Sequence, residues 1–221
     1  ENFQEIKLTH HYQEFDDIVE QFNLMNKKLN NSSVSLEKMK KIVDERTQVL
    51  EQLSKTDPLT EVGNRRALFE RGEMEFTRGL RNKSKFTLIL IDCDLFKNIN
   101  DQFGHLFGDK LLKHVCNICN QEIRDIDFLA RYGGEEFVIL LPDCDIKEGV
   151  EIGKRIQASL ANNCLLIQGN EVCMTLSMGI TSLTTDHKDF YQLINDADQA
   201  MYLAKKNGRN RIEVVTDCHL H

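Results

Sequence analysis

Two short groups of acidic residues in this sequence have types and spacing suited to holding a divalent cation and a phosphate. The first is Arg131-Tyr132-Gly133-Gly134-Glu135-Glu136-Phe137, in which two glycines are followed directly by two carboxylates. The apolar runs 128–132 and 137–141 predict two strands joined by a tight hairpin, with Gly-Gly supplying the positive φ of the turn. Mg²⁺ binds carboxylate and phosphate oxygens. Two surface acids on a solvated hairpin tip are the alternative for this motif alone.

The second group follows an uninterrupted apolar run, 86–91, whose length and β-branching predict a buried central strand. The sequence Asp92-Cys93-Asp94-Leu95-Phe96-Lys97-Asn98-Ile99-Asn100-Asp101 begins where that strand ends, and Gly104-His105 and Gly108-Asp109 follow. A carboxylate that leaves a buried strand is costly unless it is paired or bound to a metal. We therefore expect Asp92 to share ions with the hairpin acids.

Together these segments resemble the signature of the GGDEF family of diguanylate cyclases. The family pattern reads D-x-D-x-F-K-x-x-N-D, then G-H-x-x-G-D, then R-Y-G-G-[DE]-E-F, and every position is matched here. The resemblance covers roughly residues 55–215. A further family pattern, D-x-L-T-G-L-x-N-R-R, is matched from Asp57 to Arg66, except that Glu61-Val62 replace Gly-Leu. The missing glycine bears on the local turn and not directly on the chemistry.

The resemblance implies condensation of two GTP molecules into cyclic di-GMP, with release of two pyrophosphates. In such phosphoryl transfer a protein mainly positions groups and neutralises charge. The resemblance also implies two Mg²⁺ (or Mn²⁺) ions per active site, held by Asp92, Glu135, Glu136 and the Cys93 carbonyl. Glu135 also matches the residue usually assigned as the catalytic acid or base. Since a metal-bound carboxylate is a poor proton acceptor, the metal role is the main expectation for it.

The resemblance also implies which residues contact the nucleotide. Asn100 and Asp109 match the guanine-reading pair, because a carboxylate accepts from guanine N1–H and N2–H together, whereas adenine has no donor at N1. The residues that match phosphate contacts are Lys97, Lys205, Arg209 and the backbone N–H of Phe96. His105 lies between the guanine residues, and it is as readily a packing residue at a helix start as a ligand contact.

Five residues separate Arg124-x-x-Asp127 from Gly133. At this position the family carries its product-inhibition site, where Arg124 would contact guanine or phosphate and Asp127 would accept from a guanine edge. So short a motif is common by chance, and a plain surface salt pair is the alternative.

Residues 1–54 contain neither proline nor glycine. Apolar residues recur with three-four spacing at Phe15, Ile18, Phe22, Met25, Leu29, Leu36, Met39, Val43, Leu50 and Leu53, with Ser32 and Arg46 in the two remaining slots. This a/d seam of about six heptads predicts a coiled-coil stalk, continuous through Asn30-Asn31-Ser32-Ser33. Its front resembles the second helix of a HAMP linker, and 44–53 resembles the signalling stalk that often precedes a cyclase domain.

A homodimer follows from the resemblance, because one domain holds one GTP and a two-fold symmetric product requires two domains face to face. We expect the stalk to align the dimer and to transmit a signal by altering that geometry. We further expect a cytoplasmic domain, tethered to a sensor or membrane segment outside this chain as the cytoplasmic part of an inner-membrane receptor. No apolar run reaches the roughly 18 residues of a membrane span.

Charge and cysteine content narrow the class of protein. A net charge of −7 argues against a nucleic-acid polymer as partner. Seven scattered cysteines, among them Cys93, Cys164 and Cys173 in apolar runs, indicate reduced thiols of a cytosolic protein. Cys116-x-x-Cys119 resembles a redox or zinc pair, but it lies in a helical stretch and no second pair follows.

The order of predicted elements defines an α+β fold. Helices are expected at 66–81, 108–121, 146–162 and 190–206, and strands at 86–92, within 128–141, and at 165–167, 171–183 and 211–215. Strand-helix-strand-strand-helix-strand is a ferredoxin-like core, the palm-like fold that the resemblance implies. The expected organisation is a stalk (1–54), a cyclase domain (55–216) and an unassigned tail (217–221).

Two alternatives from other classes stay open at this point. One is a non-catalytic receptor domain that binds GTP or cyclic di-GMP, and the other is a structural coiled-coil protein with an inert head. Degenerate family members usually lose an acid of the hairpin or of the first strand, so intact Asp92, Glu135 and Glu136 favour an enzyme.

Overall fold

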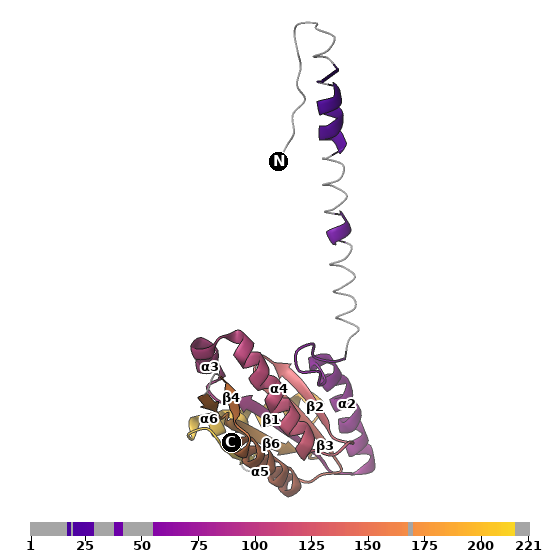
Figure 1. Ribbon diagram of the computed structural model, residues 1–221. Coiled ribbons are helices and arrows are strands. Elements are labelled where there is room, and N and C mark those ends of the chain that lie inside the picture. The colour runs from indigo at the N-terminus through magenta and orange to yellow at the C-terminus, as the bar shows by residue number, and fades with distance from the viewer. Residues whose placement is uncertain (1–16, 19, 29–37, 42–54, 168–169, 215–221) are drawn as a thin grey trace. The chain divides into compact units, whose positions relative to one another are not determined.

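The computed structural model of the protein describes residues 17–18, 20–28, 38–41, 55–167 and 170–214 (Figure 1). The chain divides into two compact units, Glu1–Ser54 and Lys55–His221. Within the described ranges, no helix is both long enough and apolar enough to cross a membrane. The expected C-terminal tail and most of the expected stalk lie outside those ranges.

The described residues of the first unit are helical. Four predicted seam positions fall among them, and Ile18, Phe22, Met25 and Met39 are all exposed in the single chain. An exposed apolar stripe on a helix is what a coiled-coil partner covers. The other seam positions lie outside the described residues, so the coiled coil stays a prediction.

A five-stranded sheet forms the centre of the second unit, with the order β2-β3-β1-β6-β7. At its middle, β1 (Phe86–Cys93) pairs antiparallel with β3 (Glu136–Pro142) and with β6 (Leu176–Ser182). On the outer sides, β2 (Phe128–Gly133) is antiparallel to β3 and β7 (Ile212–Val214) is parallel to β6. All eight residues of β1 are buried, as the apolar run predicts for a central strand.

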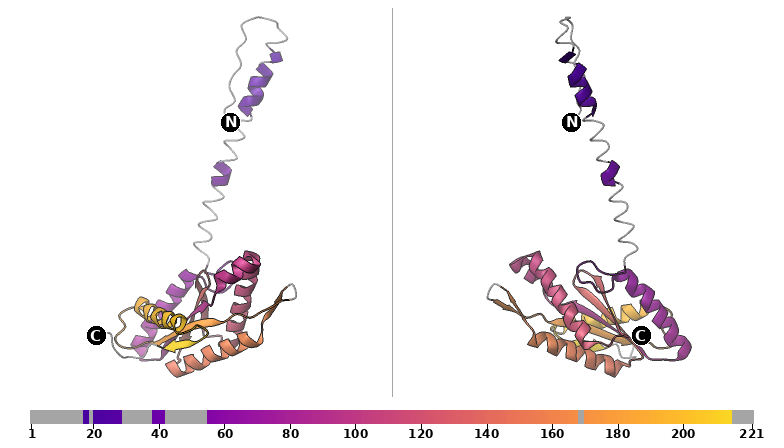
Figure 2. Two further views of the ribbon diagram at one scale, coloured as in Figure 1. Left: turned by 90° about the vertical axis from the view of Figure 1, so that its left-hand side faces the viewer. Right: turned by 45° about the vertical axis from the view of Figure 1, so that its right-hand side comes forward.

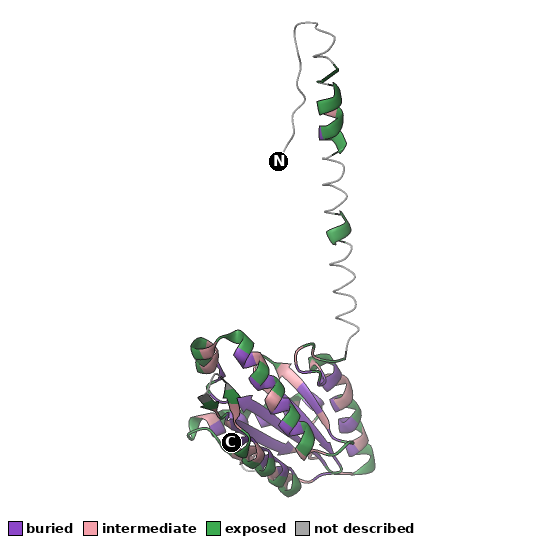
Figure 3. Cartoon of the chain, viewed as in Figure 1, coloured by how far each residue is buried: buried purple, intermediate pink, exposed green. Residues whose placement is uncertain are grey.

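Helices cover both faces of this sheet. Alternate residues of β1 divide between them: Ile89 and Ile91 pack with α4 (His105–Glu122) and α5 (Ile146–Asn162). Leu88 and Leu90 pack with α2 (Arg65–Asn82) and α6 (Phe190–Lys206) on the other face. Figure 3 shows the buried sheet between helices whose outer faces are exposed. The strands β1, β2, β3 and β6, connected through α4 and α5, have the predicted ferredoxin-like arrangement.

Local sequence signals set several helix boundaries. Helix α5 begins after Asp145, which forms a reciprocal capping box with Glu148, and α6 begins after Asp189, which accepts from the N–H of Gln192. Both helices span the predicted residues, 146–162 and 190–206. Helix α2 extends the prediction by one residue at each end, beginning after the Asn64 cap.

Two parts of the predicted order are wrong. The structure has a further short helix, α3 (Phe96–Phe103), and Gly104, at φ 86°, separates it from α4, which begins at His105 and not at Gly108. The single strand predicted at 171–183 is divided. Its first part, β5 (Asn170–Val172), forms a separate two-stranded hairpin with β4 (Leu165–Ile167), and β6 begins only at Leu176 (Figure 2). The chain leaves the strand conformation between them because Thr175 bonds to Asp94 through both its backbone and its hydroxyl.

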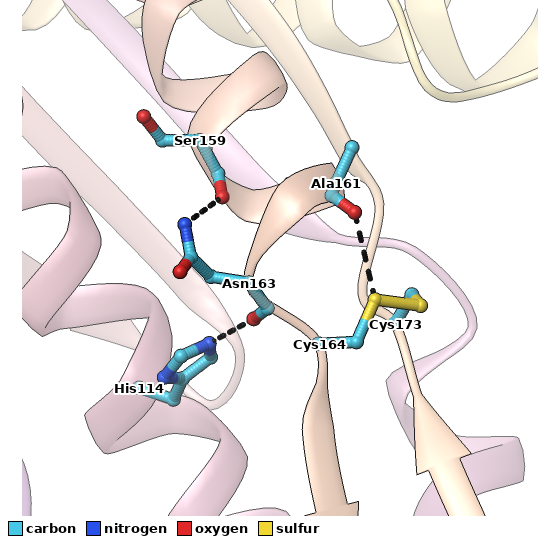
Figure 4. The surroundings of a disulfide bond; sticks show 6 residues. All are labelled: His114, Ser159, Ala161, Asn163, Cys164 and Cys173. Carbon is cyan, nitrogen blue, oxygen red and sulfur yellow. Dashed lines mark hydrogen bonds between the residues drawn. A yellow bond between two sulfur atoms is a disulfide. The ribbon is translucent and has the colours of Figure 1, made fainter.

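The cysteine prediction is wrong at two positions. Cys164 and Cys173 form a disulfide at the base of the β4–β5 hairpin, where the strand register places them opposite each other (Figure 4). Cys93, Cys116, Cys119 and Cys144 are free and buried. Burial raises the pKa of the Cys116 thiol to about 12 and that of Cys119 further, so both stay protonated and serve as small apolar residues of the α4 core.

The turn that departs from the family pattern keeps its shape without glycine. Asp57 accepts from the N–H and the hydroxyl of Thr60, and Glu61 donates its N–H to the Asp57 carbonyl. Glu61 itself has a φ of 62°, the left-handed region in which a non-glycine residue costs about 1 kcal/mol. The hydrogen bonds of Asp57 therefore hold a conformation that glycine would adopt more easily.

Candidate active site

The acids of the two sequence motifs meet where the end of β1 lies beside the start of β3, and we call this group of Asp92, Glu135 and Glu136 the acidic edge. Asp92 and Glu136 are direct cross-strand partners in β1 and β3, so their side chains project from the same face. Glu135 precedes Glu136 in the turn, and its carbonyl accepts from the N–H of Cys93. The turn consists of Gly134, at φ 48°, and Glu135, whereas Gly133 is the last residue of β2. The expectation that both glycines form the turn is therefore wrong by one residue.

Arg131 is a supporting residue that the sequence analysis did not single out. Its Nε and NH2 groups donate to the carbonyl of Gly134 at 2.9 and 2.7 Å, which closes the turn between β2 and β3. Its NH1 group donates to both oxygens of Asp57, at 3.2 and 3.3 Å. The guanidinium thus links the turn that carries Glu135 to the first loop of the domain. The position of Arg131 in the hairpin motif was visible in the sequence, but its partner 74 residues away was not.

The acidic edge is electrostatically crowded. Burial raises the pKa of Asp92, with smaller contributions from Glu135 and Asp94, and Lys205 offsets part of this rise. Burial likewise raises the pKa of Glu136, with Asp92 the next largest cause. Lys205, on α6, places its Nζ 2.7 Å from Asp92 Oδ2. A cation at this edge therefore relieves an unfavourable cluster of negative charge.

The donor set at this edge fits Mg²⁺ or Mn²⁺. Three carboxylates and the Cys93 carbonyl are hard oxygen ligands of the kind these ions prefer. Among the residues that the structure describes, these acids do not form a group of three whose ligand atoms all lie within 4.8 Å of one another. Asp92 forms an ion pair with Lys205, and a metal ion bound at Asp92 would replace this ion pair or share the carboxylate with it. A cavity of about 420 Å³, lined in part by Glu136 and Lys205, opens beside them.

We expect Glu136→Gln to raise the melting temperature of the metal-free protein at pH 7. A carboxyl whose pKa is higher in the folded than in the unfolded state supports folding below the unfolded pKa. It loses that contribution as the pH rises through the folded pKa. The ionised Glu136, whose pKa burial raises, therefore opposes folding at neutral pH. The difference between the two proteins should vanish below the ordinary pKa of a glutamic acid, about 4.3. Mg²⁺ should raise the melting temperature of the wild type by more than that of the variant.

Calorimetry in EDTA and in Mg²⁺ measures both effects. Glu151→Gln, an exposed acid on α5, is the matched control and should change neither value. A lower melting temperature for Glu136→Gln in EDTA would contradict this account of the acidic edge.

The two predicted guanine residues lie on neighbouring helices. Asn100 belongs to α3 and Asp109 to α4, and Gly108 packs so closely that an added Cβ would lie 2.0 Å from Asn100 Oδ1. Asn100 Oδ1 is buried and has no hydrogen-bond donor in the part of the chain that the structure describes. A buried acceptor without a donor is costly, and an N–H group of a bound base would satisfy it. His105, the first residue of α4, is exposed.

The predicted phosphate residues come from two places. Phe96 and Lys97 begin α3 directly after Leu95, whose φ of 56° turns the chain into the helix, so their N–H groups are the unpaired ones of a helix start. Lys205 lies in the last turn of α6, and Arg209 follows in an exposed loop. Both segments adjoin the end of β1, since Asp94 accepts from the N–H of Asn210 in that loop.

Arg124 and Asp127 are bonded to each other. Two guanidinium nitrogens of Arg124 donate to the two oxygens of Asp127, at 2.8 and 3.1 Å, and the Arg124 N–H donates to the same carboxylate. The side chain of Asp127 is fully buried, whereas that of Arg124 is 50% exposed. A ligand at this place would meet Arg124 first.

Comparison with known proteins identifies the family. The protein-family model described as "Diguanylate cyclase, GGDEF domain" matches residues 54–211 of the sequence. The chain therefore belongs to the GGDEF family. Among curated proteins, it is 42% identical to the diguanylate cyclase DgcP of Pseudomonas aeruginosa over 164 residues, which are 74% of this chain and 24% of that protein. It is 32% identical to the diguanylate cyclase DosC of Escherichia coli over 214 residues, 91% of this chain and 46% of DosC. The chain thus spans less than half the length of these relatives.

Solved structures share the fold. The diguanylate cyclase SiaD of P. aeruginosa, solved in complex with its activator SiaC, superposes with a TM-score of 0.70 at 30% identity, covering 91% of this chain and 80% of SiaD. The active GGEEF domain of a diguanylate cyclase from Vibrio cholerae gives a TM-score of 0.66 at 34% identity, covering 70% of this chain and 98% of that one. The GGDEF domain of DgcB from Caulobacter crescentus, solved in complex with c-di-GMP, gives 0.70 at 26% identity, covering 72% of this chain and 92% of that one.

Proposed function

We propose that this protein is a diguanylate cyclase that condenses two GTP molecules into cyclic di-GMP and two pyrophosphates. The observation that carries the proposal is the acidic edge, where Asp92 and Glu136 lie side by side and Glu135 adjoins them in the turn. A receptor domain that only binds nucleotide has no need to keep all three acids in this crowded, partly buried arrangement.

The roles of the residues follow from their places. Asp92, Glu135, Glu136 and the Cys93 carbonyl would hold two Mg²⁺ or Mn²⁺ ions, which polarise the phosphate and lower the pKa of the attacking hydroxyl when bound. Lys205, Arg209, Lys97 and the N–H of Phe96 bind and orient the triphosphate. Asn100 and Asp109 hold the guanine, so that the α-phosphate comes to rest at the acids.

Base selection tests this assignment without requiring turnover. We expect Asp109→Ala to weaken binding of α,β-methylene GTP by about tenfold or more, because a carboxylate that accepts two guanine N–H groups is lost. Binding of the corresponding ATP analogue should stay weak and unchanged. Calorimetric titration of both analogues measures the ratio of their affinities. Asp101→Ala is the control, because Asp101 is an exposed acid on the neighbouring helix α3. Equal affinity of the wild type for the two analogues would remove the guanine assignment.

Product inhibition at Arg124 is a second part of the proposal. We expect Arg124→Ala to remove inhibition by cyclic di-GMP and to leave the initial rate at low product unchanged. The Arg124 guanidinium donates to the carbonyl of Pro142, which lies at the opposite end of β3 from Glu136. Initial rates with added cyclic di-GMP provide the readout. Arg155→Ala is the control, since Arg155 is a similarly exposed arginine that also pairs with an acid, Glu122. Inhibition that persists in Arg124→Ala would reduce this pair to a structural salt bridge.

Dimerisation completes the proposed function. Two domains must face each other because each supplies one nucleotide, and the N-terminal heptads are the segment that would align them. Tethering of the stalk to a sensor or membrane segment is part of the same proposal. The alternative function, a GTP or cyclic di-GMP receptor, would share the guanine contacts but would yield no product.

A further inference from the structure

Asp94, two residues beyond Asp92, is a buried carboxylate with a different set of partners. It is 5% exposed. Its Oδ1 accepts from the Ser177 hydroxyl at 2.6 Å, and its Oδ2 accepts from the Thr175 hydroxyl at 2.8 Å and from the Asn210 N–H at 3.0 Å. Its own N–H donates to the Thr175 carbonyl at 2.9 Å. Every one of these partners is a neutral donor or acceptor of the protein itself.

This bonding separates Asp94 from the metal-binding acids. Both of its carboxylate oxygens are occupied by protein donors, and no cationic side chain pairs with it anywhere in the described ranges. Asp92, by contrast, faces Lys205 across the edge of the site. Burying a carboxylate costs several kcal/mol unless donors satisfy its lone pairs. Because three protein donors satisfy Asp94, we ask which part of the structure these hydrogen bonds hold in place.

The contact to Asn210 identifies that part of the structure. The loop between α6 and β7 has three successive residues with positive φ: Gly208 at 113°, Arg209 at 62° and Asn210 at 47°. Left-handed backbone costs about 1 kcal/mol or more for each non-glycine residue, so the loop keeps this shape only if other contacts hold it. The Arg209 N–H donates to the Ala204 carbonyl at one side, and the Asn210 N–H donates to Asp94 at the other.

We infer that Asp94 is a positioning residue that fixes Arg209 for triphosphate binding, and is not itself a metal ligand. Its carboxylate joins the end of β1, the start of β6 and the loop after α6. The backbone of the proposed phosphate-binding residue Arg209 is thereby fixed relative to Asp92. Lys205, the ion-pair partner of Asp92, lies four residues before Arg209. This inference rests on the phosphate role proposed above for Arg209.

Binding of two nucleotides of different length tests the inference in the full chain. We expect Asp94→Ala to weaken binding of α,β-methylene GTP about tenfold, the range of one lost charge-assisted contact. Binding of GMP, which lacks the β- and γ-phosphates, should change less than about twofold by the same reasoning. A variant that had merely lost its fold would bind neither, so the ratio of the two affinities reports on position.

A double-mutant cycle with Arg209→Ala decides whether Asp94 acts through that residue. If it does, Asp94→Ala/Arg209→Ala should bind the GTP analogue no more weakly than Arg209→Ala alone. Losses that multiply in the double variant would overturn the inference.

Asp94→Asn separates positioning from metal binding. The amide oxygen of the new asparagine still accepts from the Asn210 N–H, while the amide NH2 group donates to the Ser177 hydroxyl. This variant should therefore retain its affinity for α,β-methylene GTP within about threefold. A metal ligand would lose as much through Asn as through Ala, and equal losses in the Mn²⁺ affinity of both variants would contradict the inference.

Two controls keep the outcome decisive. Should Asp94→Ala fail to fold, Thr175→Val removes one hydroxyl that orients the carboxylate, and it should reproduce the selective loss of GTP-analogue binding in smaller measure. An unchanged ratio in Thr175→Val would then refute the inference. Absence of GTP-analogue binding by the wild type would instead refute the proposed function, so the two failures are distinguishable.

Discussion

Replacing Glu135 by alanine should lower the rate of pyrophosphate release from GTP at least about a thousandfold, because the change removes a charged ligand from the centre of phosphoryl transfer. Glu135 lies in the turn itself, where Arg131 holds the preceding carbonyl, so the backbone of the turn should survive the substitution. The fold should therefore be retained, with a melting temperature close to that of the wild type.

The control separates the metal site from general acidity of the surface. Glu151→Ala removes an exposed acid on α5 that pairs with Lys154, and it should leave the rate unchanged. Steady-state pyrophosphate release at saturating GTP and Mg²⁺ is the measurement. A Glu135→Ala rate within tenfold of the wild type would show that the acidic edge is not the catalytic centre.

Charged residues at two seam positions of the stalk should have the second largest effect. Leu50→Glu/Leu53→Glu places like charges in the heptad seam, which opposes pairing of two stalks. Without the stalk the two domains must meet from solution, whereas tethered domains share an effective concentration in the millimolar range. At protein concentrations below a micromolar, the rate should fall about a hundredfold and should depend on the square of protein concentration.

A charge-matched control is available in the same segment. Gln48→Glu/Gln52→Glu adds two negative charges off the seam, and it should leave both the rate and the oligomeric state unchanged. Rates at several protein concentrations, together with the mass in solution, provide the readout. Full activity of a monomeric Leu50→Glu/Leu53→Glu protein would contradict both the dimer and the proposed mechanism.

The parts of the fold that follow from local sequence were predictable. The apolar run of β1 and the capped helices α5 and α6 carry strong local signals, and they form where the sequence places them. Helix α3, eight residues long with Phe96 as its only buried residue, is too short for a periodic pattern to identify it. The break before β6 depends on Thr175 bonding to Asp94, 81 residues earlier, so no local pattern could reveal it.

The candidate site shows the same division. The motifs predicted a shared cation site at Asp92, Glu135 and Glu136. The register of β1 with β3 does bring Asp92 beside Glu136. The sequence did not identify Arg131 and Asp94 as residues that hold neighbouring segments of the site in place. Their hydrogen-bond partners, Asp57 and Asn210, are distant in sequence and come close only in the folded chain. The disulfide between Cys164 and Cys173 escaped prediction because the number and scatter of the cysteines do not show that the pairing of β4 with β5 places these two opposite each other.

The most direct test of the proposed function is incubation of the purified chain with GTP and Mg²⁺, with the products separated by chromatography. We predict cyclic di-GMP and pyrophosphate in a ratio of one to two, and no dinucleotide from ATP. The contrary result is that GTP binds but is not converted, at protein concentrations where the mass in solution shows a dimer. That result would contradict the proposed cyclase activity and identify the domain as a nucleotide receptor.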